Sequence, residues 1–337
     1  MTVSLASLGW DAEFTAAYRP YDRRGNRPGR VSRVDLGVCT VVTAQGITRA
    51  SLAGRMLGIV AKDPLAMPTV GDWVVVRRWG DDRHTLEAVL ARRSAVVLAA
   101  AGNTAEGRVI ASNADVLAVV ESLDLVPDHG RIERLMALVC DSGARPLLLL
   151  TKADTVEDVD LVAADLSAAA PPGTPVLAVS TVTGEGMDRL RRYVAPGKTL
   201  GLLGAPEAGK STVVNALVGA VLITSRRLRA DRNLPLTTSS PAMVPVPGGG
   251  AVLDTPGLRT DGLAEAFGDL QRLAATCRIN DCSHDTEPGC GVRAGAERGD
   301  VTVRRLDNRR KLPREQVVEG SRLAALQESP TRHRDVG

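Results

Sequence analysis

Residues 199–211 read Thr199-Leu-Gly-Leu-Leu-Gly204-Ala-Pro-Glu-Ala-Gly209-Lys210-Ser211, and this stretch decides the fold. Its apolar half predicts a buried strand, and its GxxxxGKS half predicts a tight loop that opens a helix running to about Val218. Strand-like runs at 115–120, 147–150 and 175–179 alternate with helix-like runs at 131–140, 156–169 and 186–193. This alternation predicts a parallel, doubly wound α/β sheet.

The loop has the composition of a phosphate-binding site. Gly204 and Gly209 allow successive backbone N–H groups to point inward at phosphate oxygens, and the next helix adds its positive N-terminal dipole. We expect Lys210 to reach the β- and γ-phosphates of a nucleotide and the Ser211 hydroxyl to bind Mg²⁺. The residues expected to line the nucleotide here are Gly204, Ala205, Pro206, Glu207, Ala208, Gly209, Lys210, Ser211 and Thr212.

A second phosphate-sensing element follows the apolar run 251–253 and reads Asp254-Thr-Pro-Gly257. We expect Asp254 to hold Mg²⁺ through water and the Gly257 N–H to sense the γ-phosphate. The polar segment 226–247 has the character of a first switch loop, which γ-phosphate and Mg²⁺ order and hydrolysis releases. Its Mg²⁺-contacting residue is Thr237 or Thr238, and we place Thr238 with Lys210, Ser211 and Asp254 in the predicted catalytic set.

The base is read by Thr151-Lys152-Ala153-Asp154, which follows the apolar run 147–150. A carboxylate at Asp154 accepts the N1–H and N2–H₂ of guanine, whereas adenine has no matching donors. Lys152 would cover the ring, and Thr151 stands where asparagine is usual. Ser180 and Thr181 begin a loop, 180–185, that would contact the guanine oxygen. The expected ligand is therefore GTP or GDP, and Asp154 argues against an ATP-dependent kinase or ATPase.

The order of these motifs along the chain is itself informative. In an ordinary GTPase the phosphate loop comes first, Asp-x-x-Gly second and Lys-x-Asp last. Here the element at 151–154 precedes the loop at 204–211. The sequence therefore predicts a circularly permuted P-loop GTPase domain.

A cluster of metal-ligating residues lies near the C-terminus, in the pattern Cys-x₄-Cys-x-His-x₅-Cys. Three thiolates and one imidazole make a closed tetrahedral Zn²⁺ set, which predicts a structural site with no open position. The expected ligands are Cys277, Cys282, His284 and Cys290.

The region 29–98 reads as about five short strands separated by Gly and Asp turns, and this predicts a small β-barrel of the OB type. A purely structural barrel remains an alternative to an oligonucleotide-binding one. Residues 1–28 look irregular and arginine-rich. The expected division is a basic flexible extension at 1–28, a barrel at 29–98, the permuted domain at 106–262, and a helical zinc-binding domain with a basic tail at 263–337.

Composition sets the class of protein. The chain has 337 residues, 44% hydrophobic and 24% charged, and a net charge of only +3, which by itself predicts no nucleic-acid partner. No apolar run approaches the roughly 20 residues that span a bilayer. Five cysteines, three of them clustered, fit metal ligation in a reducing compartment better than disulfides. We expect a cytoplasmic monomer that does not bind membranes.

Together these residues resemble the RsgA family of ribosome small-subunit-dependent GTPases, also called YjeQ or YloQ, over about 29–315. Residues 111–115, Ala-Ser-Asn-Ala-Asp, are similar to the family's Ala-Ala-Asn-x-Asp, and the Cys/His spacing is similar to its zinc pattern. The resemblance implies an OB barrel, a permuted GTPase domain and a zinc domain. It also implies binding to the small ribosomal subunit and its rRNA late in maturation, with subunit-stimulated GTP hydrolysis coupled to release.

The chain departs from the family pattern in the first switch. Where the family reads Gly-Arg-His-Thr-Thr, residues 234–238 read Leu-Pro-Leu-Thr-Thr, so Leu236 replaces a histidine implicated in hydrolysis. Leu258 stands where many GTPases, although not this family, keep a water-orienting glutamine. Two functions therefore stay open: a subunit-stimulated GTPase, or a diverged ribosome- or RNA-binding paralogue that holds guanine nucleotide with little hydrolysis.

Overall fold

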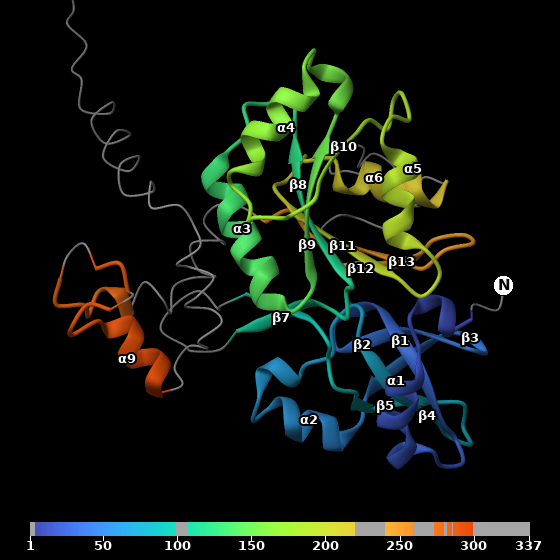
Figure 1. Cartoon of the computed structure of the whole chain (residues 1–337). Helices are drawn as coiled ribbons and strands as arrows, with labels where there is room; N and C mark the ends of the chain where they lie inside the picture. Colours follow the sequence, from blue (N-terminus) through green and yellow to red (C-terminus); the bar gives the residue numbers. More distant parts are fainter. Residues whose placement is uncertain are drawn as a thin grey trace, which may run out of the picture.

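The computed structural model describes residues 4–98, 107–219, 240–258, 273–279, 282–284 and 286–298. A barrel, an α/β unit and a short C-terminal segment are visible along the chain (Figure 1). The switch residues Leu236, Thr237 and Thr238 and the basic tail lie outside the described residues.

The N-terminal part is a closed five-stranded barrel of order β1-β2-β3-β5-β4, which confirms the predicted barrel. Its strands are β1 Asn26–Asp35, β2 Val38–Thr43, β3 Gly46–Leu52, β4 Trp73–Arg78 and β5 His84–Val89. Alternate residues of these strands point inward, as a period of two requires. The interior holds fully buried Val31, Val41, Val74, Val76 and Leu86. Helix α2, Gly54–Val60, covers one end with buried Met56.

The prediction of an irregular, flexible segment at 1–28 is wrong for residues 4–28. Helix α1, Ala12–Tyr18, begins where the Asp11 carboxylate accepts the backbone N–H groups of Glu13 and Phe14, at 3.0 and 3.2 Å. Trp10 and Phe14 pack on Trp73 of the barrel, with ring centroids 4.9 and 5.6 Å away. Phe14 and Tyr18 lie four residues apart on one face of the helix, and Trp10, just before the helix cap, packs against both rings.

Strand β6, Ala95–Leu98, lies within the range predicted for the barrel, yet it does not join the barrel sheet. It pairs antiparallel with β7, Arg108–Ser112, to form a separate two-stranded sheet. The chain thus leaves the barrel before residue 95, and β6 pairs with the next described strand, β7.

The α/β unit contains a six-stranded sheet of order β10-β9-β8-β11-β13-β12. The strands are β8 Val116–Ser122, β9 Arg145–Thr151, β10 Val176–Val179, β11 Thr199–Gly204, β12 Ala242–Pro245 and β13 Ala251–Asp254. All neighbours are parallel except β12, which runs antiparallel to β13 at the edge. The parallel sheet is confirmed. The end of the segment interpreted as a switch loop, 226–247, is instead strand β12.

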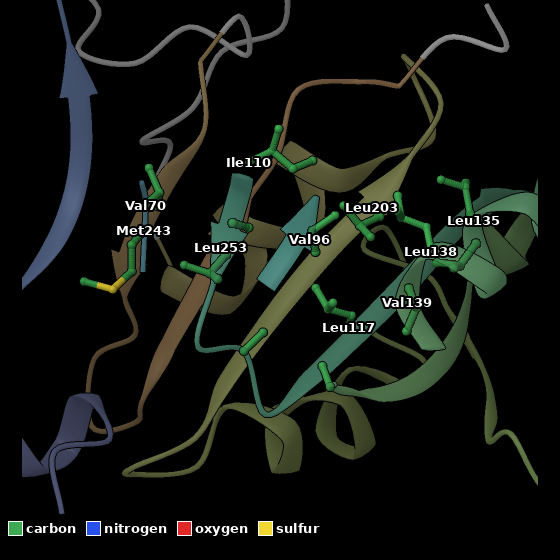
Figure 2. Close-up of a cluster of buried hydrophobic side chains, with 14 of the residues drawn as sticks. Val70, Val96, Ile110, Leu117, Leu135, Leu138, Val139, Leu203, Met243 and Leu253 are labelled. Atoms are coloured by element: carbon green, nitrogen blue, oxygen red, sulfur yellow. The ribbon is translucent and has the colours of Figure 1, made fainter. Parts of the chain in front are cut away.

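Helices cover both faces of this sheet, as expected for a doubly wound fold. Helices α3 His129–Ser142 and α4 Val159–Ser167 share one apolar cluster with the sheet, whereas α5 Met187–Arg191 and α6 Lys210–Val218 share the other. Along β8, Leu117 and Val119 belong to the first cluster, and Val116, Ala118 and Val120 to the second. Figure 2 shows Leu135, Leu138 and Val139 of α3 beside Leu117 and Leu203 of the sheet.

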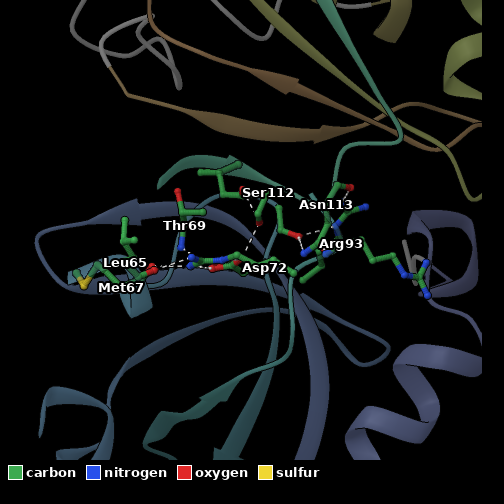
Figure 3. Close-up of polar contacts among 11 residues, drawn as sticks. Leu65, Met67, Thr69, Asp72, Arg93, Ser112 and Asn113 are labelled. Carbon is green, nitrogen blue, oxygen red and sulfur yellow. Dashed lines mark hydrogen bonds and ion pairs between the residues drawn. The ribbon is translucent and has the colours of Figure 1, made fainter. Parts of the chain in front are cut away.

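A polar network joins the barrel to the α/β unit. Fully buried Asp72 accepts hydrogen bonds from Ser112 Oγ at 2.6 Å and Thr69 N at 2.8 Å and pairs with Arg92 at 2.7 Å (Figure 3). Arg30 of β1, 1% exposed, donates to Thr199 Oγ1 and to the Asn113 carbonyl, both at 2.7 Å. Because each buried donor and acceptor is matched, the two units have one defined relative position.

The C-terminal segment carries α9, Gly291–Arg298, directly after the cysteine and histidine residues. None of the helices in the described ranges is long and apolar enough to cross a bilayer.

Candidate nucleotide-binding site and metal cluster

The sheet brings the predicted motifs to one edge. The carboxyl ends of neighbouring parallel strands lie side by side, so Thr151 ends β9 opposite Ser122 of β8, and Gly204 ends β11 opposite Val120. Asp254 ends β13 opposite Leu202 of β11. This edge is the usual ligand crevice of open α/β sheets. The permutation changes the order of the motifs along the chain and leaves their arrangement in space complete.

Two glycines shape the phosphate loop. A Cβ on Gly204 would lie 2.4 Å from the Val120 carbonyl oxygen, so only glycine fits beside β8. Gly209 has a φ of +86°, and a Cβ there would meet Thr151 Oγ1 at 3.1 Å. Helix α6 begins at Lys210, the next residue, which directs its N-terminal N–H groups into the loop.

Lys210 is the buried cation of the loop and is 6% exposed. Its Nζ donates to the carbonyl oxygens of Gly204 and Ala205, at 3.0 and 2.7 Å. Burial lowers the pKa of this ammonium to about 8, and Asp254 opposes that shift. A desolvated ammonium beside a ring of backbone donors is a site for phosphate oxygens.

Asp254 and Ser211 form the candidate Mg²⁺ position. The Ser211 hydroxyl donates to Asp254 Oδ2 at 3.2 Å, and the carboxyl is 4% exposed. Burial raises the pKa of Asp254 to about 6. The other oxygen, Oδ1, is buried and has no hydrogen-bond partner within the described part of the chain. An unmatched carboxylate oxygen beside a hydroxyl fits a hard divalent cation.

The second switch packs directly on the phosphate loop. A Cβ on Gly257 would lie 2.6 Å from the Pro206 nitrogen, so the close approach requires glycine. The Leu258 N–H donates to the Gly204 carbonyl at 3.0 Å, and the Thr255 hydroxyl donates to the Leu202 carbonyl at 2.7 Å. These contacts join the segment 254–258 directly to the phosphate loop and to strand β11.

On the base side, Ser180 and Asp154 come together. The Ser180 hydroxyl donates to Asp154 Oδ1 at 2.5 Å and accepts the backbone N–H groups of Val182 and Thr183. Ser180 is fully buried, whereas Asp154 is exposed at the edge. The serine therefore fixes one carboxylate oxygen, and the carboxylate faces solvent where a base can reach it.

Thr151 links the two halves of the site. Its Oγ1 lies 2.8 Å from the Ala208 carbonyl oxygen of the phosphate loop and 3.3 Å from the Glu121 carbonyl oxygen. The hydroxyl thus bridges the base-reading strand and the phosphate loop from the position where asparagine is usual.

Sequence reasoning missed the residues that hold Lys152. Its Nζ lies 2.5 Å from Asp124 Oδ2, and Ser122 Oγ donates to Asp124 Oδ1 at 2.5 Å. The bond from Lys152 holds the pKa of Asp124 below its usual range. Lys152 also has a φ of +58°, a left-handed conformation. The sequence did contain a signal for this contact: Ser122 and Asp124 are polar residues at the end of a buried strand, at the same sheet edge as the other motifs.

Other predicted residues are less connected. Within the described ranges, neither Thr181 nor Thr212 has a side-chain hydrogen bond to the residues above, and Thr212 is exposed. Thr238 lies outside those ranges.

The four predicted zinc ligands converge, and their donor atoms lie within 4.8 Å of one another. Cys277 Sγ and Cys290 Sγ are 4.0 Å apart, and each is 3.5 Å from His284 Nδ1. Tetrahedral bonds of about 2.0–2.3 Å would separate ligand atoms by roughly 3.5 Å, so these distances fit Zn²⁺. The Gly291 N–H donates to Cys277 Sγ at 3.3 Å, as expected for a thiolate.

Comparisons with known proteins agree with this geometry. The family model described as RsgA GTPase matches residues 89–264. A protein of Streptomyces coelicolor named small ribosomal subunit biogenesis GTPase RsgA is 43% identical over 93% of this chain and 86% of its own length. RsgA 2 of Lactiplantibacillus plantarum, with the same description, is 37% identical over 98% of this chain and 94% of its own length.

Among solved structures, YjeQ from Thermotoga maritima is similar in fold, with a TM-score of 0.52 and 22% identity over 90% of this chain and all of that one. The curated relatives extend over the barrel, the permuted sheet and the cysteine cluster alike. The chain therefore belongs to the RsgA GTPase family.

Proposed function

We propose that this chain binds GTP at the carboxyl edge of its sheet and hydrolyses it to GDP and phosphate during late maturation of the small ribosomal subunit. The observation that carries the proposal is the convergence of Asp154, Lys210 and Asp254 on one edge, although 44 to 100 residues separate them in sequence. Relatives named for small-subunit biogenesis support the partner. The same partner favours a cytoplasmic protein that acts as a monomer on the subunit and its rRNA.

In this mechanism Asp154 selects guanine, and Ser180 orients that carboxylate. Lys210 and the N–H groups of the loop hold the β- and γ-phosphates, and Ser211 and Asp254 would hold Mg²⁺. The metal, when bound, supplies positive charge to the phosphate oxygens. Thr151 ties the base-reading strand to the loop, so the base and the phosphates are held by one rigid frame. Gly204–Thr212, Thr181 and Gly257 complete the proposed contacts, and Thr238 is the proposed switch ligand.

Activation of the attacking water is the step for which the chain has no assigned residue among those described. No side chain in the described second switch offers a base toward the γ-phosphate, since Leu258 follows Gly257, and Leu236 occupies the histidine position of the first switch. We propose that contact with the small subunit orders the switch. The alternative, a nucleotide-holding paralogue with little turnover, is not favoured, because the relatives that match most of the chain are named as GTPases.

GTP turnover with and without purified small-subunit particles tests the proposal. We expect particles to raise the rate, while large subunits do not. Equal rates in both reactions would contradict the stimulated step. Single-turnover measurement of Leu236→His then shows how much of the chemical step depends on that position.

Lys210→Ala should lose GTP binding, because the loop would lack its buried positive charge toward the phosphates. Titration with a fluorescent GTP analogue measures this loss. Lys198→Ala, at the opposite edge of the sheet, serves as the control and should retain affinity. Nucleotide binding unchanged in the Lys210 variant would contradict the assigned role.

We further propose that Cys277, Cys282, His284 and Cys290 hold a structural Zn²⁺ within a C-terminal domain at 263–337, separate from a barrel at 29–98 and a nucleotide-binding domain at 106–262. Elemental analysis of purified protein should find one zinc per chain, and Cys290→Ser should lose it. Chelation should weaken binding to small subunits while GTP affinity stays constant. A protein without zinc that still binds subunits would contradict this assignment.

A further inference from the structure

A cavity of about 360 Å³ opens at the amino edge of the α/β sheet, opposite the nucleotide site. The residues that line it include apolar Val116 of β8 and Val176 of β10. Val116 and Ser122 are the first and last residues of β8. Six steps of about 3.3 Å separate them, so the cavity lies roughly 20 Å from the sheet edge that carries the phosphate loop. The cavity is therefore separate from the site that binds GTP.

The lining is strongly basic. Arg145, Arg189, Arg192 and Lys198 lie around the cavity, with Asp115 as the one acid. Asp115 is already engaged, since its Oδ2 accepts the Thr199 N–H at 2.8 Å and its Oδ1 lies 3.6 Å from Lys198 Nζ. Within the described ranges, none of the three arginines has a carboxylate within 4.0 Å. Three guanidinium groups therefore face the cavity without a counter-charge.

The neighbouring Arg191 shows the contrast. It comes from the same helical turn, yet its guanidinium donates to the carbonyl oxygens of Leu217 and Ala216 at the end of α6, at 3.4 and 3.3 Å. Arg191 thus stabilises a helix C-terminus, a structural role. Arg189 and Arg192, on either side of it in sequence, line the cavity instead.

The aromatic and apolar residues of the lining favour a nucleotide over an inorganic anion as the ligand. Tyr193 lines the cavity together with the arginines and with apolar Val116, Val176 and Leu177. Arginine forks bind phosphate in a bidentate manner, and aromatic rings stack on exposed bases of single-stranded RNA. The residues on either side of Lys198 contact the N-terminal part of the chain, since Arg30 of β1 bonds to Thr199 and the Gly197 N–H donates to the Ser7 carbonyl at 2.8 Å.

We propose that this cavity binds a nucleotide of single-stranded RNA, with the phosphate on Arg189 and Arg192 and the base against Tyr193. The proposal rests on the proposed function for its RNA partner and adds the place of contact. It gives the α/β unit an RNA-binding surface remote from GTP.

Fluorescence anisotropy of full-length protein with a labelled oligouridine of about 12 nucleotides tests the inference. Arg189→Gln and Arg192→Gln should each lose about fivefold in affinity, and the slope of log affinity against log salt should fall by about 0.7 for each contact removed. Arg191→Gln, the matched control on the same turn, should bind as the wild type does. Tyr193→Leu should bind less tightly than Tyr193→Phe, which keeps the ring.

Equal losses in all three arginine variants would reveal general surface attraction and overturn the inference, as would a wild-type protein that does not bind the oligonucleotide. Co-sedimentation with small-subunit particles separates the two proposals. If the wild type and both cavity variants sediment equally, the cavity is overturned and the proposed function stands. If the wild type does not sediment, the proposed function itself fails. GTP affinity should be the same in every variant.

Discussion

At the residue scale, the proposed choice of guanine rests on the carboxylate of Asp154. One oxygen receives the Ser180 hydroxyl, and the residue is exposed at the edge of the sheet. The hydroxyl can donate to only one of the two oxygens, so the carboxylate keeps acceptor capacity for the two adjacent N–H groups of guanine. Ser122, Asp124 and Lys152 form a second chain of contacts that fixes the lysine meant to cover the base.

Asp154→Asn should weaken GTP binding by about 10- to 100-fold, because an amide presents one acceptor and one donor where guanine needs two acceptors. The same variant should bind xanthosine triphosphate more tightly than the wild type does, since xanthine offers a carbonyl at position 2. Competition between the two nucleotides for a fluorescent analogue measures both effects. A folded variant that keeps the wild-type preference for GTP over xanthosine triphosphate would contradict the base-reading role.

At the element scale, helix α1 shows how a polar segment acquires a fixed position. Asp11 caps the helix and pairs with Arg93 at 2.7 Å, and the guanidinium of Arg93 lies over the Phe14 ring. The bond from Arg93 lowers the pKa of Asp11 from 3.8 to about 2. Because the folded pKa lies below the unfolded one, the ionised carboxylate stabilises the fold at neutral pH.

Asp11→Ala should lower the free energy of unfolding by about 1 kcal/mol at pH 7, mostly through loss of the helix cap. The difference from wild type should stay complete above about pH 4 and disappear as the pH falls through 2, where the native carboxylate takes up its proton. Urea unfolding at several pH values measures this difference. Glu13→Gln is the control, since Glu13 also pairs with Arg93 but is 76% exposed, and it should change little. Identical behaviour of the two variants would contradict the account.

At the scale of the whole molecule, one arginine joins the barrel to the nucleotide-binding unit. Arg30 donates to Leu8, Gly71, Thr199 and Asn113 and lies over the Trp73 ring. Burial lowers its pKa to about 10, so the side chain stays charged at neutral pH. Its four acceptors come from four separate stretches of chain, and their alignment depends on this one donor group.

Arg30→Met should cost about 3–5 kcal/mol, because the apolar chain fills the space but leaves buried carbonyl oxygens without donors. We expect urea unfolding to separate into two transitions, one for the barrel and one for the α/β unit, while GTP affinity is largely kept. Arg27→Met on the same strand is the matched control, since the Arg27 Nε has no partner in the described structure. A single transition at wild-type stability would contradict the role of Arg30.

The parts predicted well from sequence are those that local chemistry dictates. Apolar residues that recur every two or about every four positions predict the strands and helices of the α/β unit. The spacing of glycine and lysine predicts the phosphate loop, and the spacing of cysteine and histidine predicts the metal cluster. The prediction for segment 4–28 was wrong because its aromatic side chains pack on Trp73, which lies about sixty residues away in sequence. Strand β12 was missed because it is only four residues long and contains Pro245, and it becomes a strand through its pairing with β13 at the edge of the sheet.

The sequence by itself therefore determined which chemical groups the protein contains: a GxxxxGKS loop, a Lys-x-Asp element and a Cys3His cluster, each within a short run of residues. Only the tertiary structure decided which groups meet. It placed Asp124 on Lys152, left one oxygen of Asp254 without a partner among the described residues, buried Arg30 between two units and gathered four cations around one cavity. The physical reason is that such contacts join residues from separate strands, so they depend on sheet order and packing and leave no trace in local spacing.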